Sequence, residues 1–340
     1  MRWLPRAFGG GARKRRDAES ALRETVLSLL DRDLDRAEAL LAAEAQRSSR
    51  GVGVFLALGR LYRLRGEMGR AVRVHQNLLL RKDLAPSDRV RALADLAEDF
   101  RRGGLLRRAI AAYEEVLAHA PRHAGALRAL VRLHADVRDF DAALAVASRL
   151  ERQDPASRAR VGVWVEQAEV AHAEGRTADA RRALKRALRG DPRHARAWVL
   201  LGELEAELGH PKAALDAWRR VPELDRRAGP LVYPRLAATF AALDRPRDHE
   251  AFLHELLASQ PDDGPSRIAL ARALAARGDT DGALAELRGL LERDPDDLEA
   301  HHALGSLLLA AGKDSEALRA FADLLQRVER LGLLSRESSA

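Results

Sequence analysis

The stretch FLALGRLYRLRGEMGRAVRVHQNLLLRKDL, residues 55–84, decides the fold because it describes two short helices joined by a tight turn. The first segment carries a stripe at the i, i+3, i+4 and i+7 spacing of one helix face: Phe55, Leu58, Gly59 and Tyr62. Gly66 favours the end of this helix. Ala71, His75 and Leu78 continue the spacing beyond the turn, which predicts a second helix with a small residue facing Gly59.

The small residue of the second helix recurs along the chain at a nearly constant interval. It is found at Ala37, Ala71, Ala109, Ala143, Ala180, Ala214, Ala283 and Ala317. An interval of about 34 residues is typical of the tetratricopeptide repeat, a helix–turn–helix unit. The gap between Ala214 and Ala283 has room for one more unit, in which His249 takes the small-residue position. We expect this unit to pack least well.

Turn and stop signals recur with the same period. The turn between the two helices is predicted at Gly66, Gly103 or Gly104, Gly175, Gly209, Gly278 and Gly312, with Arg138 and Asp244 as substitutes. Proline is predicted to end the second helix, because it lacks the backbone N–H, at Pro121, Pro155, Pro192, Pro261 and Pro295. The Gly229-Pro230 pair is the best candidate for a local bend.

These signals predict an all-α fold, a tetratricopeptide-repeat right-handed superhelix (α-solenoid) of about nine helix-turn-helix units. The solenoid is expected over residues 18–331. The expected repeats are 18–51, 52–89, 90–123, 124–160, 161–194, 195–229, 230–263, 264–297 and 298–331. Residues 1–17 read as a basic flexible tail without a membrane-spanning run, and residues 332–340 as a C-terminal tail.

Composition narrows the classes of function. The 340-residue chain has no cysteine, which excludes disulfides, cysteine zinc sites and thiol catalysis. Its formal net charge is +7, but the 58 basic residues are interspersed with 51 acidic ones, a pattern typical of a helical surface with many ion pairs. Arginine greatly outnumbers lysine, which a GC-rich coding background explains as well as selection for phosphate binding does.

No catalytic or metal-binding pattern stands out. His249 and His254 are five residues apart, whereas a zinc pair on one helix face needs a spacing of four. Carboxylates have arginines nearby in the sequence, as expected of a solvated surface. We therefore predict no catalytic residue, no cofactor and no metal.

The surface built by the first helices of the repeats is the expected binding groove. Its positions are basic in the second, third and fourth repeats and apolar in the seventh and eighth. The basic candidates are Arg60, Arg63, Arg91, Arg101, Arg102, Arg128 and Arg132. The apolar half includes Pro234, Ala241, Ile268 and Ala276. We expect the basic half to bind an acidic partner segment, since guanidinium groups bind carboxylates in pairs of hydrogen bonds.

One segment carries a more specific resemblance. Residues 58–67, LGRLYRLRGE, followed by Arg70-Ala71, Arg73 and HQNLL at residues 75–79, resemble the early repeats of the lipopolysaccharide assembly protein B family. The similarity continues more weakly to about residue 110. The matching polar positions are candidates for partner contact or for locking the turn between repeats: Arg65, Gly66, Glu67, Arg70, Arg73, His75 and Gln76.

The resemblance implies an adaptor at the cytoplasmic face of the inner membrane. Family members promote degradation of the lipid A pathway deacetylase by a membrane protease, so both proteins are implied partners. Typical members also have an N-terminal membrane helix and a rubredoxin-like domain with four zinc-binding cysteines. Neither feature is found in this sequence.

The sequence therefore favours a non-catalytic repeat scaffold that regulates lipopolysaccharide synthesis through regulated proteolysis. The same resemblance implies a cytoplasmic location at the periphery of the inner membrane. Two alternatives stay open: a repeat scaffold for another envelope or motility assembly, and a binder of RNA or anionic membrane surfaces. Specific nucleic-acid recognition is not expected, and the oligomeric state is open.

Overall fold

A computed structural model describes residues 33–47 and 51–330, and every regular element in these ranges is a helix. The chain divides into two compact units, residues 1–163 and 164–340, with the boundary inside α9. The predicted N-terminal tail (residues 1–17), the first helix of the predicted first repeat and the predicted C-terminal tail (residues 332–340) lie outside the described residues.

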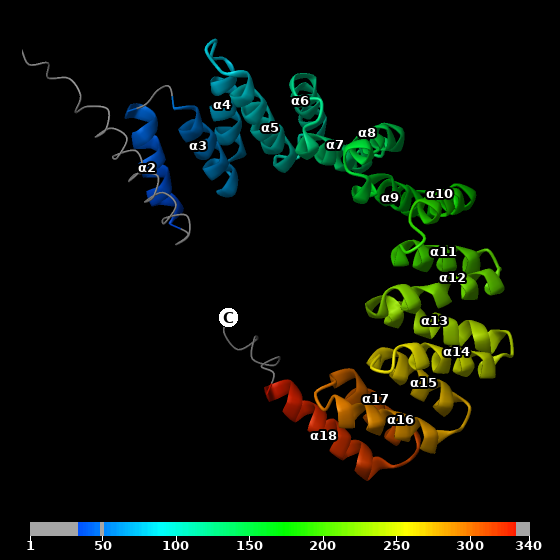
Figure 1. Cartoon of the computed structure of the whole chain (residues 1–340). Coiled ribbons are helices and arrows are strands. Elements are labelled where there is room, and N and C mark those ends of the chain that lie inside the picture. Colours follow the sequence, from blue (N-terminus) through cyan, green and yellow to red (C-terminus); the bar gives the residue numbers. More distant parts are fainter. Residues whose placement is uncertain (1–32, 48–50, 331–340) are drawn as a thin grey trace, which may run out of the picture. The chain divides into compact units, whose positions relative to one another are not determined.

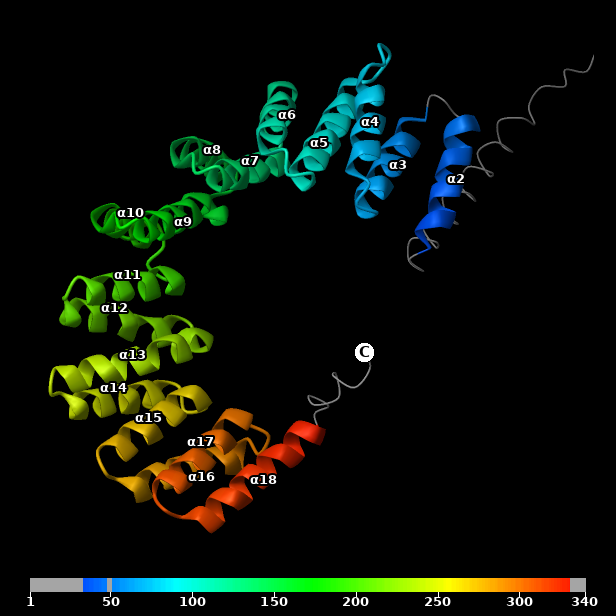
Figure 2. The same cartoon turned by 180° about the vertical axis from the view of Figure 1, so that it is seen from behind.

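Unit 1 is a series of helix pairs joined by short turns (Figure 1). Its helices are α2 (Leu34–Arg47), α3 (Val52–Leu64), α4 (Met68–Leu79), α5 (Pro86–Arg102), α6 (Leu106–His119), α7 (Ala124–Asp136) and α8 (Phe140–Gln153). A short 3-10 turn, η1 (Pro155–Ser157), leads into α9 (Ala159–Ala173). Figures 1 and 2 show α3, α5 and α7 along one side of the series and α4, α6 and α8 along the other.

Unit 2 continues the same pattern. Its helices after α9 are α10 (Thr177–Gly190), α11 (Ala195–Glu207), α12 (Pro211–Leu224), α13 (Gly229–Ala242), α14 (Pro246–Ser259), α15 (Gly264–Ala276), α16 (Thr280–Arg293), α17 (Leu298–Ala310) and α18 (Asp314–Arg330). A 3-10 turn, η2 (Arg226–Ala228), directly precedes α13. The predicted all-α repeat fold is confirmed in both units.

The small-residue position holds each pair together. Seven of the eight predicted alanines, from Ala37 to Ala283, have no exposed surface, and Ala317 is 2% exposed. A methyl group at this position lets the two helix backbones approach closely. The leucines and aromatic residues on either side then fill the core of each pair, as Leu61, Leu127 and Leu236 do with at most 2% exposure.

The turn and stop signals are confirmed. Six predicted glycines have positive φ, and the substitutes Arg138 and Asp244 also do, at 61° and 55°. The five helices that precede the predicted stop prolines end two residues before them, as α6 does at His119 ahead of Pro121. Among the described first helices, the largest difference from the predicted repeat boundaries is at α5, which begins at Pro86 rather than at residue 90, because proline favours the first turn of a helix.

Candidate functional site

The seven arginines of the predicted basic groove lie on α3, α5 and α7 of unit 1. We call the surface of these three helices the first-helix face. The structure separates the seven arginines into three groups: those bound to buried carboxylates, those paired within their own helix, and those with no ion-pair partner among the described residues.

Arg60 and Arg63 on α3 bind two aspartates of α5. Arg63 donates from Nη2 to Asp95 Oδ1 at 3.0 Å and from Nη1 to Asp99 Oδ1 at 2.8 Å. Only 11% of its side chain is exposed. Arg60 donates from Nε to both carboxylate oxygens of Asp95 at 2.9 Å, and half of its side chain faces solvent. Both arginines therefore join adjacent repeats. Arg63 does so as a buried side chain, whereas about half of the Arg60 side chain stays exposed to solvent.

His75 completes this buried network from α4. Its Nδ1 lies 2.5 Å from Asp99 Oδ2, and both side chains are fully buried. The ring occupies the space beside Gly59, where an added Cβ would lie 2.4 Å from the imidazole. Asp99, on the first helix of its repeat, thus binds both helices of the preceding repeat, α3 through Arg63 and α4 through His75. His75 therefore places a polar group on the packed side of α4.

The second group consists of Arg91, Arg101 and Arg102 on α5. Arg101 and Arg102 both bind Glu98, at 2.7 Å and 3.0 Å. The Arg101 hydrogen bonds are the main cause that lowers the pKa of Glu98 to about 2, with a further contribution from Arg102. Arg91 pairs with Asp88 at 3.2 Å. All three arginines are exposed, but each has a carboxylate three or four residues away on its own helix.

Arg128 and Arg132 on α7 form the third group. Both are exposed, and neither has an ion-pair partner in the part of the chain that the structure describes. They are one helical turn apart, so they share a face of α7. Within the predicted set, these are the two guanidinium groups that no carboxylate of the described chain engages.

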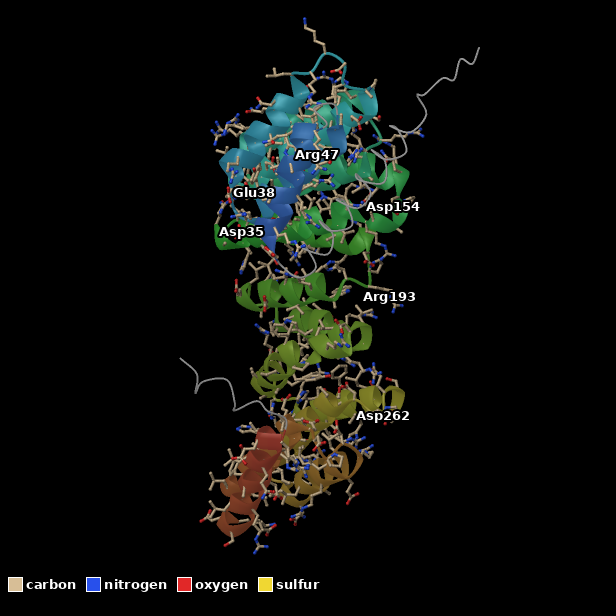
Figure 3. The ribbon with its side chains drawn as sticks, turned by 90° about the vertical axis from the view of Figure 1, so that its left-hand side faces the viewer. Asp35, Glu38, Arg47, Asp154, Arg193 and Asp262 are labelled. Carbon is tan, nitrogen blue, oxygen red and sulfur yellow. The ribbon has the colours of Figure 1, made fainter. Side chains whose placement is uncertain are left out.

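A second polar network accounts for the matching family positions around the turn. Arg65 binds Asp35 at 2.7 Å and Glu38 at 2.8 Å, both labelled on α2 in Figure 3. Arg70 binds Glu38 at 2.6 Å and Glu67 at 2.7 Å, and its guanidinium lies over the Tyr62 ring. These residues lock the α3–α4 turn against α2.

The remaining family positions divide between backbone and surface. Gly66 takes the positive φ of the turn, at 79°. Arg73 bonds the Gly69 carbonyl oxygen, and the side chains of Arg73 and Gln76 are exposed on α4. The sequence prediction missed Asp95 and Asp99 as the carboxylates that organise the first network. Their spacing of four residues on the apolar face of α5 was the available signal.

Unit 2 has a cavity, rather than a row of arginines, beside two of its first helices. A cavity of about 360 Å³ opens among α13, α14 and α15, lined mainly by apolar groups. Its walls include the expected groove residues Pro234, Ala241 and Ala276, together with Arg272 and His249. Ile268, expected in the groove, is instead 1% exposed within the core, because its side chain packs between neighbouring repeats.

Comparison with known proteins identifies the repeat. A tetratricopeptide repeat profile matches residues 103–162, 171–238, 242–307 and 274–329, and a second one matches residues 54–90. The chain belongs to the tetratricopeptide repeat family. Arrays of this kind expose extended surfaces that bind other proteins, so the fold is that of a protein-interaction scaffold.

Curated relatives include lipopolysaccharide assembly protein B of Escherichia coli K12 and of strain O157:H7. Each is 27% identical over 228 residues, which cover 66% of this chain and 58% of the relative. The match therefore spans less than two thirds of these proteins. The resemblance seen in the sequence is confirmed, and this chain is a tetratricopeptide repeat protein similar to lipopolysaccharide assembly protein B.

Solved structures of similar architecture share little sequence with this chain. A tetratricopeptide repeat protein from Parabacteroides merdae is 14% identical, with 85% of this chain and 98% of that chain covered at a TM-score of 0.45. A MamA structure from Desulfovibrio magneticus RS-1 is 18% identical, with coverage of 52% and 96% and a TM-score of 0.39.

The described helices are those of a repeat array, without a membrane span or a metal centre among them. No helix among them is both long and apolar enough to span a membrane. Within the same ranges, no three His, Asp or Glu side chains converge in a way that would hold a metal ion.

Proposed function

We propose that this chain is a non-catalytic adaptor that takes part in regulating lipopolysaccharide synthesis through regulated proteolysis. In this role it holds the lipid A pathway deacetylase and a membrane protease together at the cytoplasmic side of the inner membrane. The similarity to lipopolysaccharide assembly protein B over 66% of the chain is the observation that carries the proposal.

The contacts of the family-like segment support this role. Its polar residues are used to fix α2, α3, α4 and α5 to one another through the Glu38 and Asp99 networks. A binding surface whose backbone is held rigid loses less conformational entropy when a partner docks. The segment therefore supports an adaptor whose first repeats keep a fixed shape.

The first-helix face supplies the proposed contact with an acidic partner segment. Arg128 and Arg132 are its central residues, because they have no competing carboxylate within the described chain. Arg101 and Arg102 on the neighbouring α5 add exposed guanidinium groups, whose ion pairs with Glu98 of the same helix are partly open to solvent. Exposed pairs of this kind contribute about 0–1 kcal/mol each, so a partner carboxylate can replace them at small cost.

A reconstituted degradation assay tests the proposal. Purified deacetylase and detergent-solubilised membrane protease are mixed with and without this chain, and the half-life of the deacetylase is followed. We expect the chain to shorten that half-life several-fold in proportion to its concentration. An unchanged half-life with chain whose helical circular dichroism is intact would refute the adaptor role.

A further inference from the structure

The cavity in unit 2 lies at the repeat whose small-residue position holds a histidine. His249 stands where the other repeats have a fully buried alanine, and it is itself 5% exposed. Its ring stacks on Phe240 of α13 with 5.4 Å between ring centroids. The helices α13 and α14 contact each other less extensively than the pairs α11–α12 or α15–α16 do. The wider approach of α13 and α14 is what the sequence predicted for a histidine at the small-residue position.

This arrangement costs stability, which the stacking of His249 on Phe240 only partly offsets. His249 Nε2 is buried and has no hydrogen-bond partner in the described chain, a condition that costs about 1–3 kcal/mol. An alanine would avoid that cost and would allow closer packing, as it does in the other repeats. Residues that lower the stability of a fold are often found at binding sites, where function requires them.

The walls of the cavity determine what fits inside. Aromatic and aliphatic side chains form most of the surface, including Tyr233, Pro234, Phe240 and Ala273. Aromatic rings bury large areas and prefer to stack against other rings, which makes them the usual anchors in pockets of this kind. The volume of about 360 Å³ is also within the range of small-ligand pockets.

Arginines at the rim of the cavity favour a ligand that carries a negative charge. Arg272 lines it with 57% of its side chain exposed, and its partner Glu299 is 3.6 Å away and equally open to solvent. Arg277, the other guanidinium at the rim, is already bound to Glu250 at 3.2 Å and to Asp279 at 3.4 Å. Arg272 is therefore the cation that an incoming carboxylate can engage.

We propose that this cavity is a second partner-binding site, which takes an aromatic side chain that lies next to an aspartate or glutamate in a partner protein. The ring enters between Phe240 and Ala273, and the neighbouring carboxylate pairs with Arg272. This inference extends the scaffold role to unit 2, and it does not depend on the arginines of the first-helix face.

A displayed library of random twelve-residue peptides tests the proposal on the full chain. Peptides are selected on the wild type and counter-selected on Ala276→Trp, in which the indole closes the cavity from an exposed position. Ala251→Trp is the matched control, since Ala251 is exposed on α14 and does not line the cavity. We expect selected peptides to share an aromatic residue within two positions of an acid.

The same peptides are then titrated against purified variants. We expect at least tenfold weaker binding to Ala276→Trp, unchanged binding to Ala251→Trp, and about fivefold or greater loss with Arg272→Glu but not with Arg247→Glu. A selected consensus without an aromatic residue and an acid would overturn the proposal. So would equal binding to both tryptophan variants. Because these probes are peptides, the outcome is independent of the deacetylase assay.

Discussion

At the scale of single residues, close contact between a glycine and a histidine organises the first repeats. Gly59 leaves room for the His75 ring, and His75 in turn holds Asp99. The sequence places both residues on facing helices, but the spacing alone does not show that one ring occupies the space left by one missing methyl group.

Substitution at Gly59 tests this contact. Gly59→Ala should lower the free energy of unfolding by about 1–3 kcal/mol, because the new Cβ overpacks the histidine ring. In urea unfolding, the double variant Gly59→Ala/His75→Ala should lose less stability than the sum of the two single variants. Gly53→Ala is the control, since nothing lies within 4 Å of a Cβ there, and it should not destabilise. Strict additivity in the cycle would rule out the contact.

His249 predicts a pH dependence that belongs to one residue. Burial lowers its pKa from 6.5 to about 4. The unfolded chain takes up this proton first as the pH falls, so His249 should reduce stability progressively between about pH 6.5 and pH 4. The upper limit of this contribution is about 3 kcal/mol, since one pKa unit corresponds to about 1.4 kcal/mol.

Urea unfolding of His249→Ala at pH 7.5, 6 and 5 measures that contribution. We expect the variant to lose less stability than the wild type over this range. His254→Ala, an exposed histidine on the same helix, should keep the wild-type dependence. If His249→Ala keeps the wild-type pH dependence, the pKa of His249 is the same in the folded and the unfolded chain, which contradicts this prediction.

At the scale of helices and turns, the sequence predicts most of the fold. The period of the small residues and the turn glycines locates each pair, because these positions obey backbone rules that do not depend on neighbours. The polar networks were harder to predict. Arg63 reaches Asp99 across 36 positions, and sequence spacing does not encode which surface arginine meets which carboxylate of the next repeat.

The turn positions give a prediction of their own. Asp244 has φ of 55°, a conformation that glycine adopts without steric cost. Asp244→Gly should raise the free energy of unfolding by about 0.5–1 kcal/mol, whereas Gly278→Ala at the equivalent turn of the next repeat should lower it by about 1 kcal/mol. Asp262, labelled in Figure 3, is exposed at a turn without positive φ, so Asp262→Gly should not stabilise. Thermal unfolding of the three variants would contradict this account if Asp262→Gly stabilised as much as Asp244→Gly.

At the scale of the molecule, two kinds of surface occur on first helices of one repeat family. Unit 1 presents guanidinium groups at Arg128 and Arg132, and unit 2 presents an apolar cavity beside Arg272. The sequence predicted this change from basic to apolar along the chain. It did not predict that carboxylates of the same chain already occupy Arg60 and Arg63, because these pairs form between repeats.

The affinity of the purified chain for the lipid A pathway deacetylase tests the proposed role of the first-helix face most directly. Arg128→Glu/Arg132→Glu should weaken binding at least tenfold, because each reversal replaces an attraction to a partner carboxylate by a repulsion. Arg107→Glu/Arg122→Glu, which changes the net charge equally at exposed positions of α6 and the following turn, should bind within about twofold of the wild type. Equal weakening by both double variants, or no binding by the wild type, would contradict the account.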